Sequence, residues 1–195
     1  MKLLHTVPDS AMVAAFLKAE FDSERFSGDL KQAMHNLGVG EALVAHPDLR
    51  DDRQNALRAA LLGQHRGYQQ GRDVFEGVPE RMTWYAAELS RDEIGQARYV
   101  DYDYWNELTD HTRLVKEAVR NIQNGKTVFD VSNDRFLAVA EQIKRHGYSF
   151  EPMILWATDR DAPLELLEGH LRATAYYLAG EQAPHTIRAI VGFAR

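Results

Sequence analysis

The residues best suited to chemistry stand together near the C-terminus, as Glu168-Gly169-His170-Leu171-Arg172. An imidazole can donate, accept or exchange a proton near neutral pH. A guanidinium can form two parallel hydrogen bonds to a phosphate. Glu168 adds a carboxylate suited to a base or a metal contact. These five residues predict a polar site for an anionic ligand.

The segments before and after this box determine how it would be presented. Two short apolar runs, Met153–Ala157 and Leu164–Leu167, flank a polar turn and favour a β-hairpin. The run Leu171–Ala179 has helical spacing and is stopped by Gly180. Thr186–Val191 alternates as a last strand. The box is therefore expected at a junction between a strand and a helix.

Such a junction suits an anion for two reasons. Gly169 lets the backbone turn sharply and lets a ligand approach without a Cβ in the way. The first amides of the helix have no intrahelical acceptor and lie at the positive end of its dipole. A structural alternative stays open, because glycine between a strand and a helix is common and Arg172 could simply pair with Asp159 or Asp161.

The order strand, turn, strand, Glu-Gly-His-x-Arg, helix, strand resembles the ParB/sulfiredoxin-like superfamily, over about Phe150 to Val191. Members carry a Gly-x-x-Arg-type box at this junction, where a nucleotide's phosphates sit. The form here is most similar to the Asp/Glu-Gly-His-x-Arg variant of the free-serine kinases. The resemblance implies the following roles: phosphate or nucleotide binding by Gly169, His170, Leu171 and Arg172, catalysis by Glu168 and His170, and a metal contact by Glu168.

Two departures limit what the resemblance implies. Sulfiredoxin needs a cysteine in its box, and this chain has none, so that activity is excluded. Chromosome-partitioning ParB proteins add a DNA-binding helical domain, whereas only about twenty residues follow the box here. Both departures weaken the transfer of a specific activity and leave the expected phosphate site in place.

Composition narrows the classes of partner. The chain has 195 residues, 45% of them hydrophobic, enough for a sizeable core. Its net charge of −6 disfavours nucleic acid, because duplex binding depends on neutralising phosphates with Lys and Arg. No apolar run approaches a membrane span, and Met1–Pro8 is too short and too weakly charged for a signal peptide. A cytoplasmic location is expected.

The predicted fold class is α/β (α+β), with a helical N-terminal part on a small mixed sheet that carries the box. Residues 1–78 are expected to be helical, and residues 79–195 to form the ParB/sulfiredoxin-like region. Gln64–Pro79 is the most loop-like stretch and contains Arg72. Arg72 could reach an anionic ligand, but a solvated loop arginine is favoured. A helix closed by Gly63 is expected before this stretch, and a strand over Thr83–Leu89 after it.

Three further expectations concern residues 90–147. Ser90 and Glu93 have capping-box spacing over a short helical turn. Thr109 or Asp110 is expected to cap a helix to about Asn124 whose buried stripe is Leu114, Val115, Ala118, Val119 and Ile122. Ser132 is expected to cap another helix, closed by Gly147. Lys126-Thr127 after Gly125 is not a P-loop, because Arg120 stands where that motif needs glycine.

The aromatic segment Asp101-Tyr102-Asp103-Tyr104-Trp105 allows two interpretations. It could form a stacking surface for a base. Packing at a domain seam, with the Asp residues ending a strand, is favoured.

The leading functional hypothesis is a nucleotide-binding enzyme, a small-molecule kinase or nucleotide hydrolase that uses Mg²⁺ and a nucleoside triphosphate or diphosphate. The alternative is a non-catalytic module that senses a ligand or holds a partner protein with the same pocket. A nuclease is disfavoured by the net charge. The nucleotide, the acceptor and the oligomeric state stay open.

Overall fold

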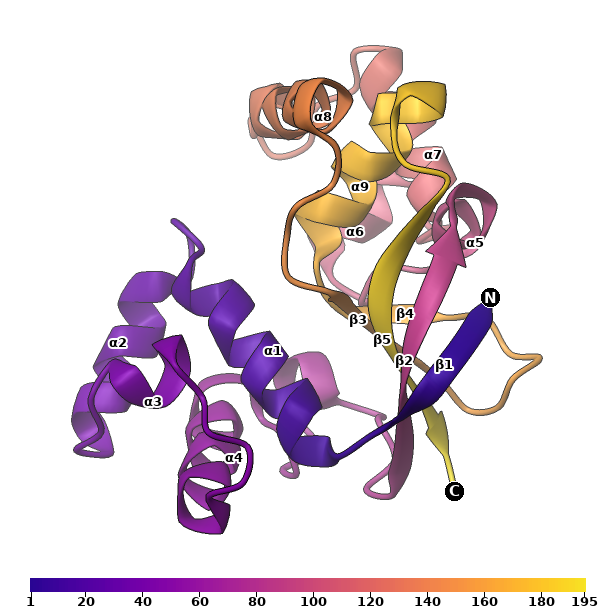
Figure 1. Ribbon diagram of the computed structural model, residues 1–195. Coiled ribbons are helices and arrows are strands. Elements are labelled where there is room, and N and C mark those ends of the chain that lie inside the picture. Colours follow the sequence, from indigo (N-terminus) through magenta and orange to yellow (C-terminus); the bar gives the residue numbers. More distant parts are fainter. The chain divides into compact units, whose positions relative to one another are not determined.

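The computed structural model describes all 195 residues and has a mixed α/β architecture with a five-stranded sheet (Figure 1). The strands are β1 Lys2–Val7, β2 Met82–Ser90, β3 Met153–Ala157, β4 Glu165–Glu168 and β5 Thr186–Ala194. The α-helices are α1 Asp9–Phe21, α2 Ser27–Asn36, α3 Ala42–Ala45, α4 Asp52–Arg66, α5 Arg91–Gln96, α6 Asp103–Leu108, α7 Val115–Gln123, α8 Asp134–His146 and α9 His170–Ala179. Two 3₁₀ turns, η1 Asp73–Phe75 and η2 Gly180–Gln182, complete the chain. No helix has both the length and the apolar character that crossing a membrane requires.

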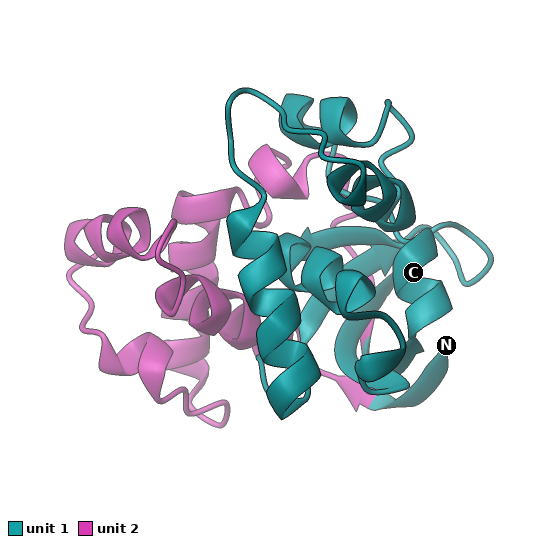
Figure 2. Cartoon of the chain, turned by 90° about the horizontal axis from the view of Figure 1, so that it is seen from above, with its two compact units in different colours: residues 1–5, 85–193 teal, residues 6–84, 194–195 magenta.

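The chain divides into two compact units, coloured separately in Figure 2. Unit 1 comprises Met1–His5 and Tyr85–Phe193. Unit 2 comprises Thr6–Trp84 together with Ala194–Arg195. Unit 1 therefore contains the whole predicted box and most of the sheet.

The strand order of the sheet is β1-β2-β5-β3-β4. The predicted hairpin is confirmed: β3 pairs antiparallel with β4, with Leu155 opposite Leu166. The predicted last strand is confirmed as well, because β5 returns parallel to β3 with Leu155 opposite Val191. Strand β3 thus has neighbours on both sides, and Met153, Ile154 and Leu155 are fully buried, as an apolar run of central-strand residues predicts.

The core of unit 1 gathers the inner faces of the sheet and of α7, α8 and α9. Helix α9 packs against both α7 and α8 (Figure 1). Its residues Ala173, Ala175 and Tyr176 are fully buried in this cluster. Small residues at Ala173 and Ala175 let the helix come close to its neighbours, so the helix that follows the box is firmly held.

The expected helix boundaries at Ser90 and Gly147 are confirmed, and the one at Ser132 is displaced by one residue. The capping box is present: the Ser90 hydroxyl accepts from the Glu93 amide at 3.3 Å, and the Glu93 carboxylate accepts from the Ser90 amide at 2.8 Å. Gly147 ends α8 as predicted, although the N-cap of that helix is Asn133 rather than Ser132. The Ser132 hydroxyl instead accepts from the Asp134 amide at 3.1 Å.

The helix expected from Thr109 or Asp110 begins only at Val115. Asp110, His111 and Arg113 all have positive φ, which a continuous right-handed helix does not allow. The buried Thr109 hydroxyl donates to the Trp105 carbonyl at 2.7 Å and accepts from the Arg113 amide at 2.8 Å. Thr109 thus closes the end of α6 instead of opening α7.

This change alters one member of the predicted apolar stripe. Val115, Ala118, Val119 and Ile122 are buried as expected, but Leu114 is only half-buried, as the N-cap of α7.

Helix α4 in unit 2 runs past Gly63, where it was expected to end. A Cβ at Gly63 would lie 3.0 Å from Gln70 Nε2 and 3.1 Å from the Tyr68 carbonyl oxygen, so this glycine allows a close packing contact. The helix ends at Gly67, which is left-handed with φ 78°. Arg72 is not simply solvated, because its guanidinium donates to the carbonyls of Gly63 and Gln64 at 2.9 and 3.0 Å.

A buried charge cluster ties α4 to α1 within unit 2. The Glu20 carboxylate, on α1, accepts from Arg66 Nε at 2.9 Å and lies 2.5 Å from His65 Nε2. Its side chain is only 4% exposed. The cluster neutralises a carboxylate that would otherwise be buried at high cost.

Candidate functional site

Gly169 makes the junction between β4 and α9 possible. It is the N-cap of α9 and has left-handed backbone angles, φ 98° and ψ 21°. A Cβ at this position would lie 2.7 Å from Met153 Cγ and 3.2 Å from Met153 Cβ, on the fully buried first residue of β3. Glycine is required here for both conformation and space. The chain therefore turns directly from strand to helix.

The N-terminus of α9 has no capping side chain and no acidic residue in its first turn. The first intrahelical hydrogen bond runs from the Ala173 amide to the Gly169 carbonyl at 2.8 Å. The amides of His170, Leu171 and Arg172 precede that bond, so they belong to the unpaired first turn. The positive end of the α9 dipole is thus not neutralised by a cap, in contrast to α5 with its complete capping box.

Arg172 is directed into the protein. The residue is 9% exposed, and its guanidinium donates to the Glu168 carboxylate and to the Glu151 carbonyl oxygen. Tyr148 lies beside it, and burial lowers the pKa of Arg172 while the neighbouring Tyr148 and Glu151 oppose that shift. Burial raises the pKa of Tyr148 to about 12. The charge of Arg172 is therefore compensated inside unit 1.

The partner of Arg172 is not an aspartate of the hairpin turn. Asp159 instead accepts from the amides of Asp161 and Ala162, at 2.9 Å each, and so stabilises the turn. Glu168, four residues before Arg172, takes the role of partner. Arg172 thus forms a structural ion pair, as the alternative interpretation expected, but its partner is Glu168 and not Asp159 or Asp161.

Glu168 does not fit the predicted metal contact in this arrangement. Its side chain is 15% exposed and its Oε2 already accepts from Arg172. No group of three or more His, Asp or Glu residues in the chain is arranged so that it could hold a metal ion. A hard cation such as Mg²⁺ prefers several oxygen ligands, and a carboxylate bound by a guanidinium supplies few. Glu168 therefore does not serve as a metal ligand while it is paired with Arg172.

His170 lies against a stack of aromatic rings. Tyr99 and Trp105 are stacked at 4.0 Å between centroids with 5° between planes. The imidazole of His170 lies 5.6 Å from Trp105 and 6.0 Å from Tyr99, both at 17°. The hydroxyl of Thr174, one turn along α9, donates to the His170 carbonyl oxygen at 2.8 Å. The half-buried His170 is held in one orientation from both its ring and its backbone.

The structure thereby brings together two motifs that lie about sixty residues apart in the sequence, the box and the aromatic segment. Trp105 is buried, which confirms packing for this residue, although α6 rather than the end of a strand carries it. Tyr104 is half-buried and lies edge-on to Trp105 at 5.0 Å, and Tyr102 is 39% exposed. The Tyr104 ring thus extends the aromatic cluster beyond Trp105, and Tyr102 is an exposed ring in the same segment. Leu171 packs against the core.

Sequence reasoning missed Tyr99, Thr174 and Tyr148 as supports of the box. The Tyr99 hydroxyl and Thr174 Oγ1 are 2.7 Å apart in the core, and burial raises the pKa of Tyr99, which keeps it a neutral phenol. No local pattern marks such a contact, because the two residues are far apart in the sequence. The pairing of Glu168 with Arg172 had no such signal either, because Glu168 ends β4 and the i, i+4 rule holds only for two residues of one helix.

Comparisons with protein-family models, with curated proteins and with solved structures find no match to this chain.

Proposed function

We propose that unit 1 is a binding module for a small phosphorylated molecule, a nucleotide, held at the N-terminus of α9. The observation that carries the proposal is the uncapped first turn of α9, which follows Gly169 directly and presents His170 beside an aromatic cluster. Backbone amides at a helix N-terminus bind phosphate, and aromatic rings stack on bases. The element order β3, β4, box, α9, β5 also agrees with the ParB/sulfiredoxin-like resemblance.

The residues divide into two roles in this proposal. The amides of His170 and Leu171, with the His170 side chain, contact the phosphate. Glu168 and Arg172 form an internal ion pair. This pair fixes the junction and positions α9, and it does not touch the ligand. Tyr102 and Tyr104 supply the rings for the base. The unit then binds anions through dipoles and an imidazole and not through a free arginine.

Phosphoryl transfer or nucleotide hydrolysis is the second candidate. It is favoured by His170 alone, because a fixed imidazole beside a phosphate can accept a proton from an attacking hydroxyl. The carboxylate of Glu168 would have to leave Arg172 before it could act as a base. The geometry therefore favours a binding function over a catalytic one.

The test is isothermal titration calorimetry with ATP, ADP and AMP, each with and without Mg²⁺. His170→Ala should weaken nucleotide binding roughly tenfold, the effect of losing one hydrogen bond to a charged group. The control is His185→Ala, which changes an exposed histidine in the segment between α9 and β5. The proposal fails if no nucleotide binds at millimolar concentration, or if both substitutions weaken binding equally. Conversion of ATP to ADP or AMP by the wild type, lost in His170→Ala, would favour the enzyme.

A further inference from the structure

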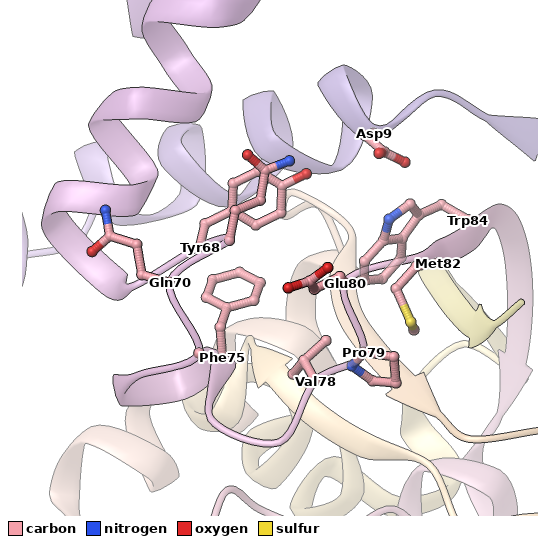
Figure 3. Close-up of a pocket in the computed structure, with 11 residues that line it drawn as sticks. Asp9, Tyr68, Gln70, Phe75, Val78, Pro79, Glu80, Met82 and Trp84 are labelled. Carbon is pink, nitrogen blue, oxygen red and sulfur yellow. The ribbon is translucent and has the colours of Figure 1, made fainter.

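Unit 2 contains a pocket of about 260 Å³ that has no part in the proposal above (Figure 3). Every residue that lines it belongs to unit 2. The lining comes from the start of α1, from the turn after α4, from η1, from the segment that leads into β2, and from Met82 and Trp84 of β2 itself.

Three aromatic side chains form the walls of this pocket. Trp84 and Phe75 are each 3% exposed and Tyr68 is 9% exposed, so their rings are fixed by the packing of unit 2. Tyr68 and Phe75 meet edge to face at 5.2 Å. The negative faces of such rings attract cations, with Trp the strongest of the three types.

The charged residues of the lining are both carboxylates, Asp9 and Glu80. Neither side chain has a hydrogen bond or an ion pair within the protein. Figure 3 shows the Glu80 carboxylate directed into the space among the aromatic rings, with Asp9 at the edge near Trp84. No Lys, Arg or His lines the pocket. An anionic ligand would meet only like charge here.

Tyr68 adds a neutral donor. Burial, together with the smaller effect of the negative charge of Asp9, raises the pKa of Tyr68 to about 12. The phenol therefore keeps its proton at neutral pH and cannot become a third anion. The pocket offers aromatic faces, two carboxylates and a hydroxyl.

We propose that this pocket binds a small organic ammonium ion, an alkylated amine of about the size of choline. Aromatic rings and nearby carboxylates recognise a weakly hydrated cation with apolar substituents, whereas a metal ion would need more oxygen ligands at fixed distances. Val78, Pro79 and Met82 supply apolar surface for the alkyl groups. The volume lies just below the range of about 300–1,000 Å³ typical of drug-sized ligands, which favours a small molecule.

The first experiment compares choline with its neutral carbon isostere, 3,3-dimethyl-1-butanol, by isothermal titration calorimetry on the full chain. The two molecules have the same shape and differ in charge. Choline should bind at least roughly tenfold more tightly, because both the cation–π attraction and the carboxylates act only on the charged form. Equal affinity for the two, or no heat from choline at millimolar concentration, would overturn the proposal.

The second experiment places the site. Glu80→Gln keeps the shape of an exposed side chain and should weaken choline binding roughly two- to fivefold, as expected for a solvated charge. Trp84→Leu should weaken it roughly tenfold. Glu76→Gln, an exposed carboxylate on the same segment that does not line the pocket, is the matched control and should bind like the wild type. Loss of binding in the control equal to that in Glu80→Gln would mean that the pocket is not the site. If Trp84→Leu unfolds, the comparison of Glu80→Gln with Glu76→Gln decides alone.

Discussion

Removing the charge of Arg172 should destabilise unit 1 strongly, because its partner would stay behind. The side chains of Arg172 and Glu168 are 11% and 15% exposed. In Arg172→Met the apolar length of the side chain is kept, while the Glu168 carboxylate and the Glu151 carbonyl lose their donor. Breaking one side of a buried ion pair costs roughly 3–5 kcal/mol. The remaining exposure of Glu168 places the expected loss near the lower end of that range.

Urea unfolding followed by far-ultraviolet circular dichroism measures this loss. The control is Lys144→Met, which removes one side of the local pair with Glu141 on α8, whose side chains are 30% and 52% exposed. That substitution should cost less than about 1 kcal/mol. The double variant Glu168→Leu with Arg172→Met should be more stable than Arg172→Met alone, because no charge is then left buried.

One result would refute this reasoning. If Arg172→Met is as stable as the Lys144→Met control, the guanidinium is not needed inside unit 1. Arg172 would then be available for a ligand, and the role that the ParB/sulfiredoxin-like resemblance implies for it would regain support. Equal effects of the single and double variants would likewise mean that Glu168 and Arg172 do not depend on each other.

Three further predictions use the same unfolding measurement. Gly169→Ala should lower the free energy of unfolding by roughly 2–5 kcal/mol, because it adds left-handed strain and a steric clash. The loss should be clearly larger than in Gly125→Ala, where φ is 81° and no atom lies within 4 Å of the added Cβ. Equal losses in the two variants would exclude the clash. Ile122→Ala should lower the free energy of unfolding by roughly 2–5 kcal/mol, and Leu114→Ala should lower it less, because Leu114 is only half-buried. The reverse order would contradict the observed start of α7. Burial raises the pKa of Glu165 above its ordinary range, although the neighbouring Arg113 opposes that shift. The contribution of Glu165 to stability should therefore decline as pH rises through the raised pKa, and this decline should be absent in Glu165→Gln. Parallel pH profiles of the two proteins would contradict the prediction.

The parts of the fold that the sequence predicted well depend on neighbouring residues. Ser90 and Glu93 define a helix start within four positions, and the β3–β4 hairpin with α9 and β5 follows from short apolar runs and glycines. Strand β1 had no comparable signal: it is six residues long and mostly exposed, so its sequence shows no clear alternation of apolar and polar residues.

The candidate site was predictable in its position but not in its contacts. Glycine between a strand and a helix indicated the left-handed junction at Gly169 and the unpaired amides after it. The partners of the box come from distant segments: Glu151 and Tyr148 follow α8, Tyr99 precedes α6, and Trp105 lies in α6. These contacts depend on tertiary packing, and no residue spacing in the sequence predicts them. Thr109 is a similar case, since a residue typical of a helix start closes a helix end instead.

The pairing of Arg172 with Glu168 also predicts how a nucleotide would be recognised. Without a free arginine, a phosphate at α9 is bound by the His170 side chain and by the dipole and amides of one helix terminus, and the helix terminus is worth roughly 0.3–1 kcal/mol and at most about 2 kcal/mol. Stacking of a base on an aromatic side chain adds roughly 1–3 kcal/mol. AMP should therefore bind roughly tenfold or more tightly than inorganic phosphate, and most of that advantage should disappear in Tyr104→Leu, whose ring lies at the outer side of Trp105. Titration calorimetry with both ligands measures the difference. If inorganic phosphate binds as tightly as AMP, the affinity resides in the phosphate contacts, which would require Arg172 to exchange Glu168 for the ligand.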